Sequence, residues 1–215
     1  MENHLYIYVV DRDFGFAPNP FHGFCTLATC KPIIRNNAKL NDWILGVGGR
    51  RLEATGRCVF LAKVTEIITF NDYWNDPRFK LKKPIRNGSM VMMVGDNIYH
   101  QLPDSTDWLQ EDSHHSNADG TTNIENLTRD TSSLNVLISE HFYYFGQSAP
   151  IIDLASINYT NHIGHSKKKI SEKDVSSFIN SIESKFLKSK NLVLDDPFDF
   201  DSAIKRVNQV TGKVI

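Results

Sequence analysis

The first 150 residues carry short apolar runs separated by loops, and no helical pattern of ten or more residues lies between them. The runs Leu5–Val10 and Cys58–Ile68 are rich in β-branched and aromatic residues, which is typical of buried strands. A parallel doubly wound sheet needs long, usually helical crossovers between its strands. We therefore predict an α+β protein with a small mixed β-sheet or a partly open β-barrel. One sheet is expected to contain the strands near Tyr6, Ile44, Val59 to Val64 and Val136.

Two short helices and one long helix are predicted. Pro32 suits the first turn of a helix and indicates a helix over residues 33–38. Thr69 or Asn71 is expected to cap a short helix around residues 72–74. A capping-box pattern begins at Ser171 and predicts an amphipathic helix that ends near Lys190 and packs outside the sheet. Its apolar positions recur at helical spacing at Val175, Phe178, Ile179, Ile182 and Phe186.

The bulk properties narrow the class of protein. With 215 residues, we expect a domain over residues 1–150 and a C-terminal helical extension over 151–215 that packs on the same domain. The formal net charge of −1 leaves no global basic excess, so a nucleic-acid contact must be a local patch. The N-terminus lacks the pattern of a secretion signal, and no apolar run approaches the ~18 residues of a membrane span. Together with an odd number of cysteines, three, this indicates a cytoplasmic protein without a membrane partner.

A glycine-rich segment, Gly46-Val47-Gly48-Gly49, follows a predicted strand and is itself followed by Arg50. It lacks the third glycine and the long helix of a dinucleotide-binding motif, so no nucleotide cofactor is predicted. The glycines suit a close backbone approach, and the neighbouring arginine suits either a phosphate or a solvated hairpin tip.

The cysteines offer two weak possibilities. Cys25 and Cys30, together with His22 and His114, would be a zinc set, but the second short-spaced pair that structural zinc sites show is missing. Small buried thiols are the favoured interpretation, and no metal is predicted. A nucleophilic Cys25 near His22 stays open, although proximity in sequence does not establish contact.

The segment Asp112–Ser116 places two histidines side by side and, with neighbouring His100 and Asp119, forms the densest group of proton-transferring side chains. On an extended segment the adjacent rings of His114 and His115 would face opposite ways, so at most one would easily enter a site. Two interpretations stand equally. The histidines act as a general base or as a hydrogen-bonding reader of a ligand, or the loop is pinned by its own Asp and Ser hydrogen bonds.

Aromatic side chains alternate with basic residues between Trp43 and Trp108. The segment from Arg78 to Arg86 has five basic residues and no acidic one. Proteins recognise single-stranded or flipped bases with flat aromatic rings placed beside cations. Each aromatic residue alone is more often part of a core. As a group they indicate a nucleotide-facing surface.

Several of these motifs resemble one family. They are the string Asp-Phe-Gly-Phe-Ala-Pro-Asn-Pro-Phe-His-Gly at residues 13–23, the segments 73–79 and 95–100, Asp112–Ser116 and Arg129–Thr131. Between about Leu5 and Phe145 the chain resembles the second type of nucleotide modification associated domain. That family occurs in bacteria and phages, and the resemblance implies a context of nucleotide modification or phage defence rather than one reaction. A weaker, fold-level similarity to PUA- and EVE-type readers of modified bases implies a PUA-like barrel.

Two functions remain open. The first is a binding module that holds a modified nucleobase or nucleotide in an aromatic, Arg-rimmed pocket. The second is an enzyme that acts on a nucleotide or modified base through His and Asp acid–base residues. The partner would be a nucleotide or a nucleic acid with a modified base, and a protein of the same defence or modification system is a further candidate partner; no cofactor is predicted. The predicted ligand-binding residues are Asn19, Trp43, Gly46, Gly48, Arg50, Tyr73, Trp74, Arg78, Tyr99 and His100. The predicted catalytic residues, for an enzyme, are His22, Asp96, His114, His115 and Asp119.

Overall fold

A computed structural model of the chain describes residues 3–159, 165–167 and 172–206. The chain folds into two compact units, each assembled from separate segments. The first unit contains Met1–Asp13, Ala38–Glu66 and Ser139–Phe198, and the second contains Phe14–Asn37, Ile67–Ile138 and Asp199–Ile215. The described residues mix helices with small open sheets, none of which closes into a barrel, so the predicted α+β class with an open sheet is confirmed.

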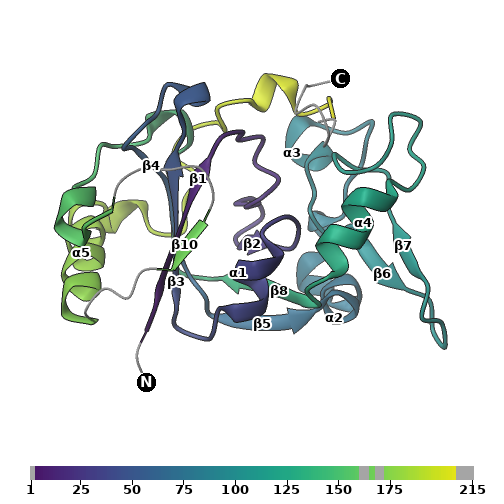
Figure 1. Ribbon diagram of the computed structural model, residues 1–215. Coiled ribbons are helices and arrows are strands. Elements are labelled where there is room, and N and C mark those ends of the chain that lie inside the picture. The colour runs from purple at the N-terminus through teal and green to yellow at the C-terminus, as the bar shows by residue number, and fades with distance from the viewer. Residues whose placement is uncertain (1–2, 160–164, 168–171, 207–215) are drawn as a thin grey trace. The chain divides into compact units, whose positions relative to one another are not determined.

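The first unit is built on a five-stranded sheet with the order β10-β1-β3-β4-β9 (Figure 1). Its strands are His165–Lys167 (β10), Leu5–Val10 (β1), Trp43–Gly48 (β3), Cys58–Lys63 (β4) and Phe142–Tyr144 (β9). β1 and β3 run parallel, and the other neighbours run antiparallel. Every residue of β3 and nearly every residue of β1 and β4 is buried, because both faces of these central strands are covered.

Helix α5 (Glu172–Lys185) belongs to this unit and forms where the helical spacing predicts it. The side chains of Val175, Phe178, Ile179 and Ile182 are only 3–4% exposed, so the apolar stripe is fully packed. The helix ends at Lys185, before the predicted end near Lys190, and a 3-10 turn follows at Leu187–Ser189 (η5). The predicted first residue, Ser171, lies outside the described residues.

The second unit contains a three-stranded sheet with the order β2-β8-β5 and a hairpin of β6 and β7. Its strands are Cys25–Leu27 (β2), Asn135–Ser139 (β8), Glu66–Thr69 (β5), Tyr99–Gln101 (β6) and Trp108–Gln110 (β7). The expectation that Val136 shares a sheet with Tyr6 and Ile44 is wrong, because its strand β8 pairs with β2 and β5 instead. Apolar composition marks a strand but does not choose its partner, so the sequence could not separate the two sheets.

The helices of the second unit are short. They are Pro32–Asn37 (α1), Phe70–Asn75 (α2), Met90–Met93 (α3) and Ile124–Thr131 (α4). Pro32 begins α1, as predicted. Thr69 caps α2 through a capping box with Asp72, which confirms the first of the two predicted caps. The remaining 3-10 turns are η2 (Pro77–Lys82) and η6 (Phe200–Ser202) in this unit, and η1 (Arg50–Leu52), η3 (Gly146–Ser148) and η4 (Leu154–Ile157) in the first.

Aromatic rings fill the core of the second unit. The conspicuous Phe residues of the segment 13–23 lie inside it rather than on a loop surface, and each is at most 8% exposed. The buried aromatic members of this cluster are Phe14, Phe16, Phe21, Phe70, Tyr73, Phe79, Tyr99 and Phe200. Each fully buried ring of this size contributes about 1.5–3 kcal/mol, so this cluster accounts for much of the unit's stability. None of the described helices has the length and apolar composition that a membrane span requires.

Candidate functional site

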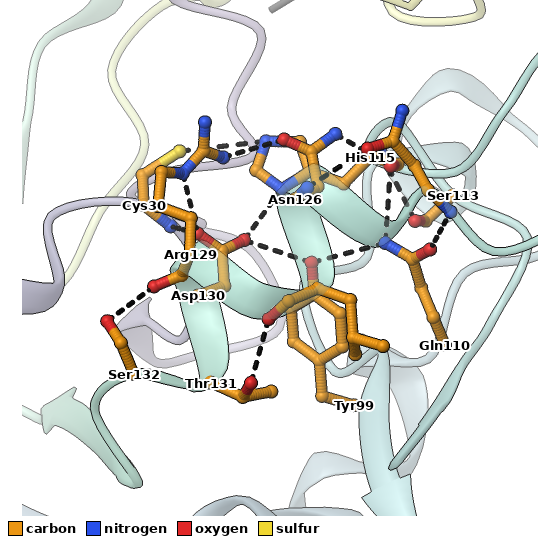
Figure 2. A network of polar contacts seen from close by, with 12 residues as sticks. Cys30, Tyr99, Gln110, Ser113, His115, Asn126, Arg129, Asp130, Thr131 and Ser132 are labelled. Atoms are coloured by element: carbon orange, nitrogen blue, oxygen red, sulfur yellow. Dashed lines mark hydrogen bonds and ion pairs between the residues drawn. The ribbon is translucent and has the colours of Figure 1, made fainter.

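Three side chains from distant parts of the second unit form a linear hydrogen-bonded array (Figure 2). The Cys30 Sγ lies 3.6 Å from His115 Nε2, and His115 Nδ1 lies 2.8 Å from Asp130 Oδ2. His115 is 3% exposed and Asp130 is fully buried, whereas Cys30 is partly exposed. A nucleophile, a base and an orienting acid in this sequence of contacts are the parts of a nucleophilic catalytic triad.

Local backbone geometry presents the cysteine. Cys30 lies in the turn between β2 and α1 with a φ of 56°, and Lys31 follows with a φ of 42°. Two consecutive non-glycine residues in the left-handed region are unfavourable by about 1–2 kcal/mol each. Such strain persists only where the surrounding structure enforces it, and it concentrates at functional sites.

Asp130, in the last turn of α4, accepts four hydrogen bonds. The Cys30 amide (3.0 Å) and Arg129 Nε (3.2 Å) donate to Oδ1, while His115 Nδ1 and the Tyr99 hydroxyl (3.0 Å) donate to Oδ2. Burial alone would raise the pKa of this carboxyl, but His115 and the neighbouring guanidinium groups outweigh burial and lower the pKa to about 2. Asp130 is therefore a fixed anion that orients the imidazole.

Asp130 affects the Cys30 thiol through His115, whose ring lies between them. Burial would lower the pKa of His115, but Cys30 and Asp130 raise it to about 9. Burial likewise would raise the pKa of the Cys30 thiol, but His115 outweighs burial and lowers it. Both shifts favour a thiolate beside an imidazolium at neutral pH, which is the reactive form of a catalytic cysteine.

The turn that carries His115 is fixed by hydrogen bonds. Its carbonyl accepts from Gln110 Nε2 (3.2 Å) and Asn126 Nδ2 (2.8 Å), and its amide donates to Ser113 Oγ (3.2 Å). Gln110 Nε2 also donates to the Tyr99 hydroxyl at 3.2 Å. These bonds agree with the interpretation of a loop pinned by its own hydrogen bonds, and the pinned turn also places His115 against Asp130.

The same three residues form the one group, within the described part of the chain, whose ligand atoms lie close enough together to hold a metal ion. An ion between Cys30 Sγ and His115 Nε2 would find Asp130 on the far side of the imidazole, where it already accepts four hydrogen bonds. Two ligands are fewer than a protein zinc site supplies. The arrangement therefore fits a nucleophile better than a metal cage.

The alternative zinc set and the alternative nucleophile gain no geometric support. Cys25 is buried, and burial raises the pKa of its thiol to about 12, so it stays protonated. Neither it nor His22 or His114 belongs to the described group of closely placed metal-ligating atoms.

The predicted catalytic residues separate. No hydrogen bond between described residues joins any two of His22, Asp96, His114 and Asp119, and only His115 enters the array. The His114 ring packs against Phe14 at 4.4 Å and Phe16 at 5.3 Å between centroids, and burial lowers its pKa to about 3. Asp119 is exposed and accepts from Thr121. Among the residues that the structure describes, the buried Nε2 of His22 and Nδ1 of His114 have no hydrogen-bond partner.

Asp96 belongs to a second buried polar cluster, centred on Lys82. The Lys82 ammonium donates to the Asn19 carbonyl (2.9 Å), to Asn19 Oδ1 (2.8 Å) and to the Phe24 carbonyl (2.7 Å). Asp96 accepts from the Tyr73 hydroxyl and from Thr26 Oγ1, both at 2.7 Å. Two predicted ligand-binding residues, Asn19 and Tyr73, are thus at most 1% exposed and bonded to protein groups.

Trp74 is partly exposed, but both faces of its indole are covered. The His100 ring stacks on it at 3.9 Å with an interplanar angle of 11°, and Lys83 Nζ lies 3.4 Å from the ring centroid. Both groups cannot fit on one face at these distances, so they lie on opposite faces. Arg78 is exposed and pairs with Asp76 at 2.7 Å.

The remaining predicted ligand-binding residues lie in the first unit. Trp43 lines a cavity of about 170 Å³ with His141, Lys63 and Glu183. A Cβ at Gly46 would lie 2.1 Å from the Phe60 ring, and one at Gly48 would lie 2.4 Å from Ala54, so these glycines allow close packing. Arg50 is exposed in η1.

Sequence reasoning did not assign Cys30, Asp130 and Arg129 to the site. Asp130 was visible only as part of the motif Arg129–Thr131, and Cys30 only as a buried thiol or as a member of the zinc set that was not favoured. The separations of 85 and 15 residues between partners carry no spacing signal. The left-handed turn at Cys30 could not be predicted from the sequence, because neither Cys30 nor Lys31 is a glycine, the residue that usually marks such a turn.

Fold and site together describe an α+β protein with a buried imidazole–carboxylate pair beside a partly exposed thiol. The chain belongs to the nucleotide modification associated domain 2 family, whose model matches residues 2–204 and so extends well past Phe145. This membership indicates a role associated with nucleotide modification. No curated protein and no solved structure matches the chain.

Proposed function

We propose that the protein is a cysteine-dependent enzyme that acts on a nucleotide or on a modified base within nucleic acid. The observation that carries the proposal is the array of Cys30, His115 and Asp130, in which Cys30 is a partly exposed residue and Asp130 is fully buried. The family supplies the substrate class, since its role is associated with nucleotide modification. The enzyme hypothesis already included His115 as an acid–base residue but assigned no nucleophile. Cys30 supplies that nucleophile in the present proposal.

The chemistry is attack on an electrophilic carbon, such as an acyl or amidine carbon that carries a nitrogen or oxygen leaving group. The Cys30 thiolate forms the C–S bond as the bond to the leaving group breaks, and His115 Nε2 gives the leaving group its proton. Neutral His115 then takes a proton from water, whose oxygen forms the new bond to carbon. The C–S bond breaks, which restores the thiolate and the imidazolium. Asp130 keeps the imidazole in the required orientation throughout.

The test is direct trapping of the covalent intermediate. The protein is incubated with nucleosides and oligonucleotides that carry acyl, carboxamide or amidine modifications on the base, and intact mass spectrometry detects the adduct. We expect an adduct on Cys30, release of the cleaved group, and loss of both in Cys30→Ser. The matched control is Cys58→Ala, because Cys58 is fully buried and burial keeps its thiol protonated.

Alkylation provides a second readout that needs no substrate. Iodoacetamide should modify Cys30 with a midpoint below the ordinary thiol pKa of about 8.5, and His115→Ala should return the midpoint toward it. His115 rather than His114 is therefore the residue that decides between an enzyme and a reader. A Cys30 thiol that titrates normally in the folded protein would refute the proposal.

A reader of modified bases is the second candidate, and the partial exposure of Trp74 beside the exposed Arg78 favours it. A base could stack on Trp74 if Lys83 moved aside, while Arg78 left Asp76 to meet a phosphate. Trp74→Ala should then weaken binding of a modified oligonucleotide by ~1–3 kcal/mol. Arg78→Ala should weaken it and flatten its salt dependence. Unchanged affinity in both variants would exclude this pocket.

The wider context is also a proposal. A substrate base within nucleic acid and a partner protein from the same modification or phage-defence system both agree with the family. Co-purification of the tagged chain, with nuclease treatment of one half of the sample, separates a nucleic-acid partner from a protein partner.

A further inference from the structure

Arg35, in α1, is fully buried and contacts both the thiol-bearing residue and its distant acid. Its Nε donates to the Cys30 carbonyl at 2.9 Å, and one terminal nitrogen donates to the Asp130 carbonyl. The other terminal nitrogen donates to the carbonyls of Ser133 (3.0 Å) and Asn135 (2.8 Å). One guanidinium thus joins the turn after β2, the end of α4 and the start of β8.

This arrangement is unusual for a buried cation. A buried charge is strongly unfavourable unless it is paired and hydrogen-bonded. Within the described part of the chain, the hydrogen bonds that the Arg35 guanidinium donates all go to backbone carbonyls, and the guanidinium also lies 5.3 Å from the Phe70 ring centroid. The negative charges that face it are therefore the nearby Asp130 carboxylate and the Cys30 thiolate, both of which stabilise its charged form. Arg129 is the neighbouring cation that opposes it.

We propose that Arg35 is a positioning residue of the Cys30–His115–Asp130 array. Its planar fork fixes the backbone of Cys30 and of Asp130 in one frame, which keeps the thiol within reach of the imidazole that Asp130 orients. Its positive charge stabilises the Asp130 carboxylate and the Cys30 thiolate. Lysine could not replace it, because an ammonium group lacks the planar set of donors that reaches carbonyls on three segments at once.

The inference rests on the proposed function, so its test must separate the two. A merely structural arginine would affect stability alone, whereas a positioning residue also sets the reactivity of the thiol. The experiment measures iodoacetamide alkylation of Cys30 against pH, by peptide mapping, and thermal unfolding in the same samples. The variants are Arg35→Lys and, as a matched control for lost core packing in the same helix, Ile34→Ala, since Ile34 is also fully buried.

Both variants should lower the melting temperature. Only Arg35→Lys should move the alkylation midpoint upward, by about one pH unit, and so reduce the rate at pH 6 about tenfold. If Arg35→Lys does not fold, Phe70→Leu serves in its place, because it removes the ring beside the guanidinium and retains an apolar side chain. It should shift the midpoint in the same direction.

The outcomes are distinct. An ordinary midpoint in the unmodified chain overturns the proposed function and this inference with it. A low midpoint that stays unchanged in the folded Arg35→Lys or Phe70→Leu variant overturns the role of Arg35 alone. A midpoint that is raised in Arg35→Lys or Phe70→Leu, together with an unchanged midpoint in Ile34→Ala, supports the role of Arg35.

Discussion

Two buried polar clusters in the second unit use similar residues for different ends. Around Lys82, ammonium, carboxylate, hydroxyl and amide groups are all at most 1% exposed, and each charged group bonds to protein atoms. Around Asp130 the acid is equally buried and satisfied, but the array ends at Cys30, which is partly exposed and held in a left-handed turn. A saturated, enclosed network holds a fold together. A network that ends in a partly exposed residue on a strained turn, as this one does at Cys30, is able to contact a substrate.

Charge balance also distinguishes the clusters. Burial lowers the pKa of Lys82 to about 8, so its charge is only marginally maintained. In the other cluster His115 and Asp130 strengthen each other's ionised forms, and although burial and Asp130 would raise the pKa of the Cys30 thiol, His115 lowers it. We infer that the first cluster is structural and the second reactive, and five predictions test that contrast.

The largest expected effect is on the structural cluster. Lys82→Met removes the buried ammonium that donates to the Asn19 and Phe24 carbonyls and leaves Asp96 without its nearby cation, so we expect a loss of about 3–5 kcal/mol in the free energy of unfolding. Urea denaturation measures the loss. The neighbouring Lys83→Met, which removes only a contact with Trp74, should cost less than about 1 kcal/mol. Equal effects of the two substitutions would contradict the structural role.

Asp130→Asn should affect both stability and reactivity. An amide cannot accept the four hydrogen bonds of the carboxylate, and hydrogen bonds to charged groups contribute about 1.5–3 kcal/mol. We expect a loss in that range by urea denaturation, together with an alkylation midpoint of Cys30 that moves upward. A destabilised variant whose thiol keeps its low midpoint would show that Asp130 supports the fold without tuning the thiol.

The clusters should differ in how stability depends on pH. The pKa of Lys82 is lower in the folded chain than the unfolded value of about 10.4, so the unfolded chain binds more protons between pH 8 and 10.4. Stability from this cluster therefore rises with pH across that window, and Lys82→Met should remove the rise. Unfolding measured in urea at several pH values provides the slopes.

The reactive cluster gives the opposite sign once its thiol is removed. The pKa of His115 is about 9 when folded and about 6.5 when unfolded, so its stabilisation is present below pH 6.5 and is lost as the pH rises toward the folded value. In the unmodified chain the thiol proton of the unfolded state offsets this loss. Cys30→Ala lowers the folded pKa of His115 but leaves Asp130 to raise it. That variant should lose stability as the pH rises above 6.5, and a flat profile would contradict a raised pKa.

The smallest effect on stability is expected from Cys30→Ser. The side chain is partly exposed and similar in size, so the free energy of unfolding should change by less than about 1 kcal/mol. Alkylation and adduct formation should nevertheless disappear. A large loss of stability would place Cys30 with the structural residues around Lys82.

Much of the local structure could be predicted. The apolar run Leu5–Val10 forms a strand, Pro32 begins a helix, and the spacing from Val175 to Ile182 forms the amphipathic helix. The run Cys58–Ile68 was predicted as one strand but forms two, β4 and β5, which belong to different sheets. These features depend on residues near one another in the chain, where propensity, capping and periodicity act directly. Strand partners depend on side-chain packing across the sheet, which is why Val136 was assigned to the wrong sheet.

The candidate site was likewise predictable from the sequence only in part. The sequence by itself determined the family motifs, the unusual Asp112–Ser116 segment and the inclusion of His115 among the proton-transferring residues. Only the tertiary structure decided that Cys30 and Asp130 are its partners, that Arg35 links both, and that Asp96 lies with Lys82. The physical reason is that pKa values and reactivity are set by burial and by neighbours within a few ångströms. Those neighbours lie up to 100 residues apart in the chain, so the folded structure alone brings them together.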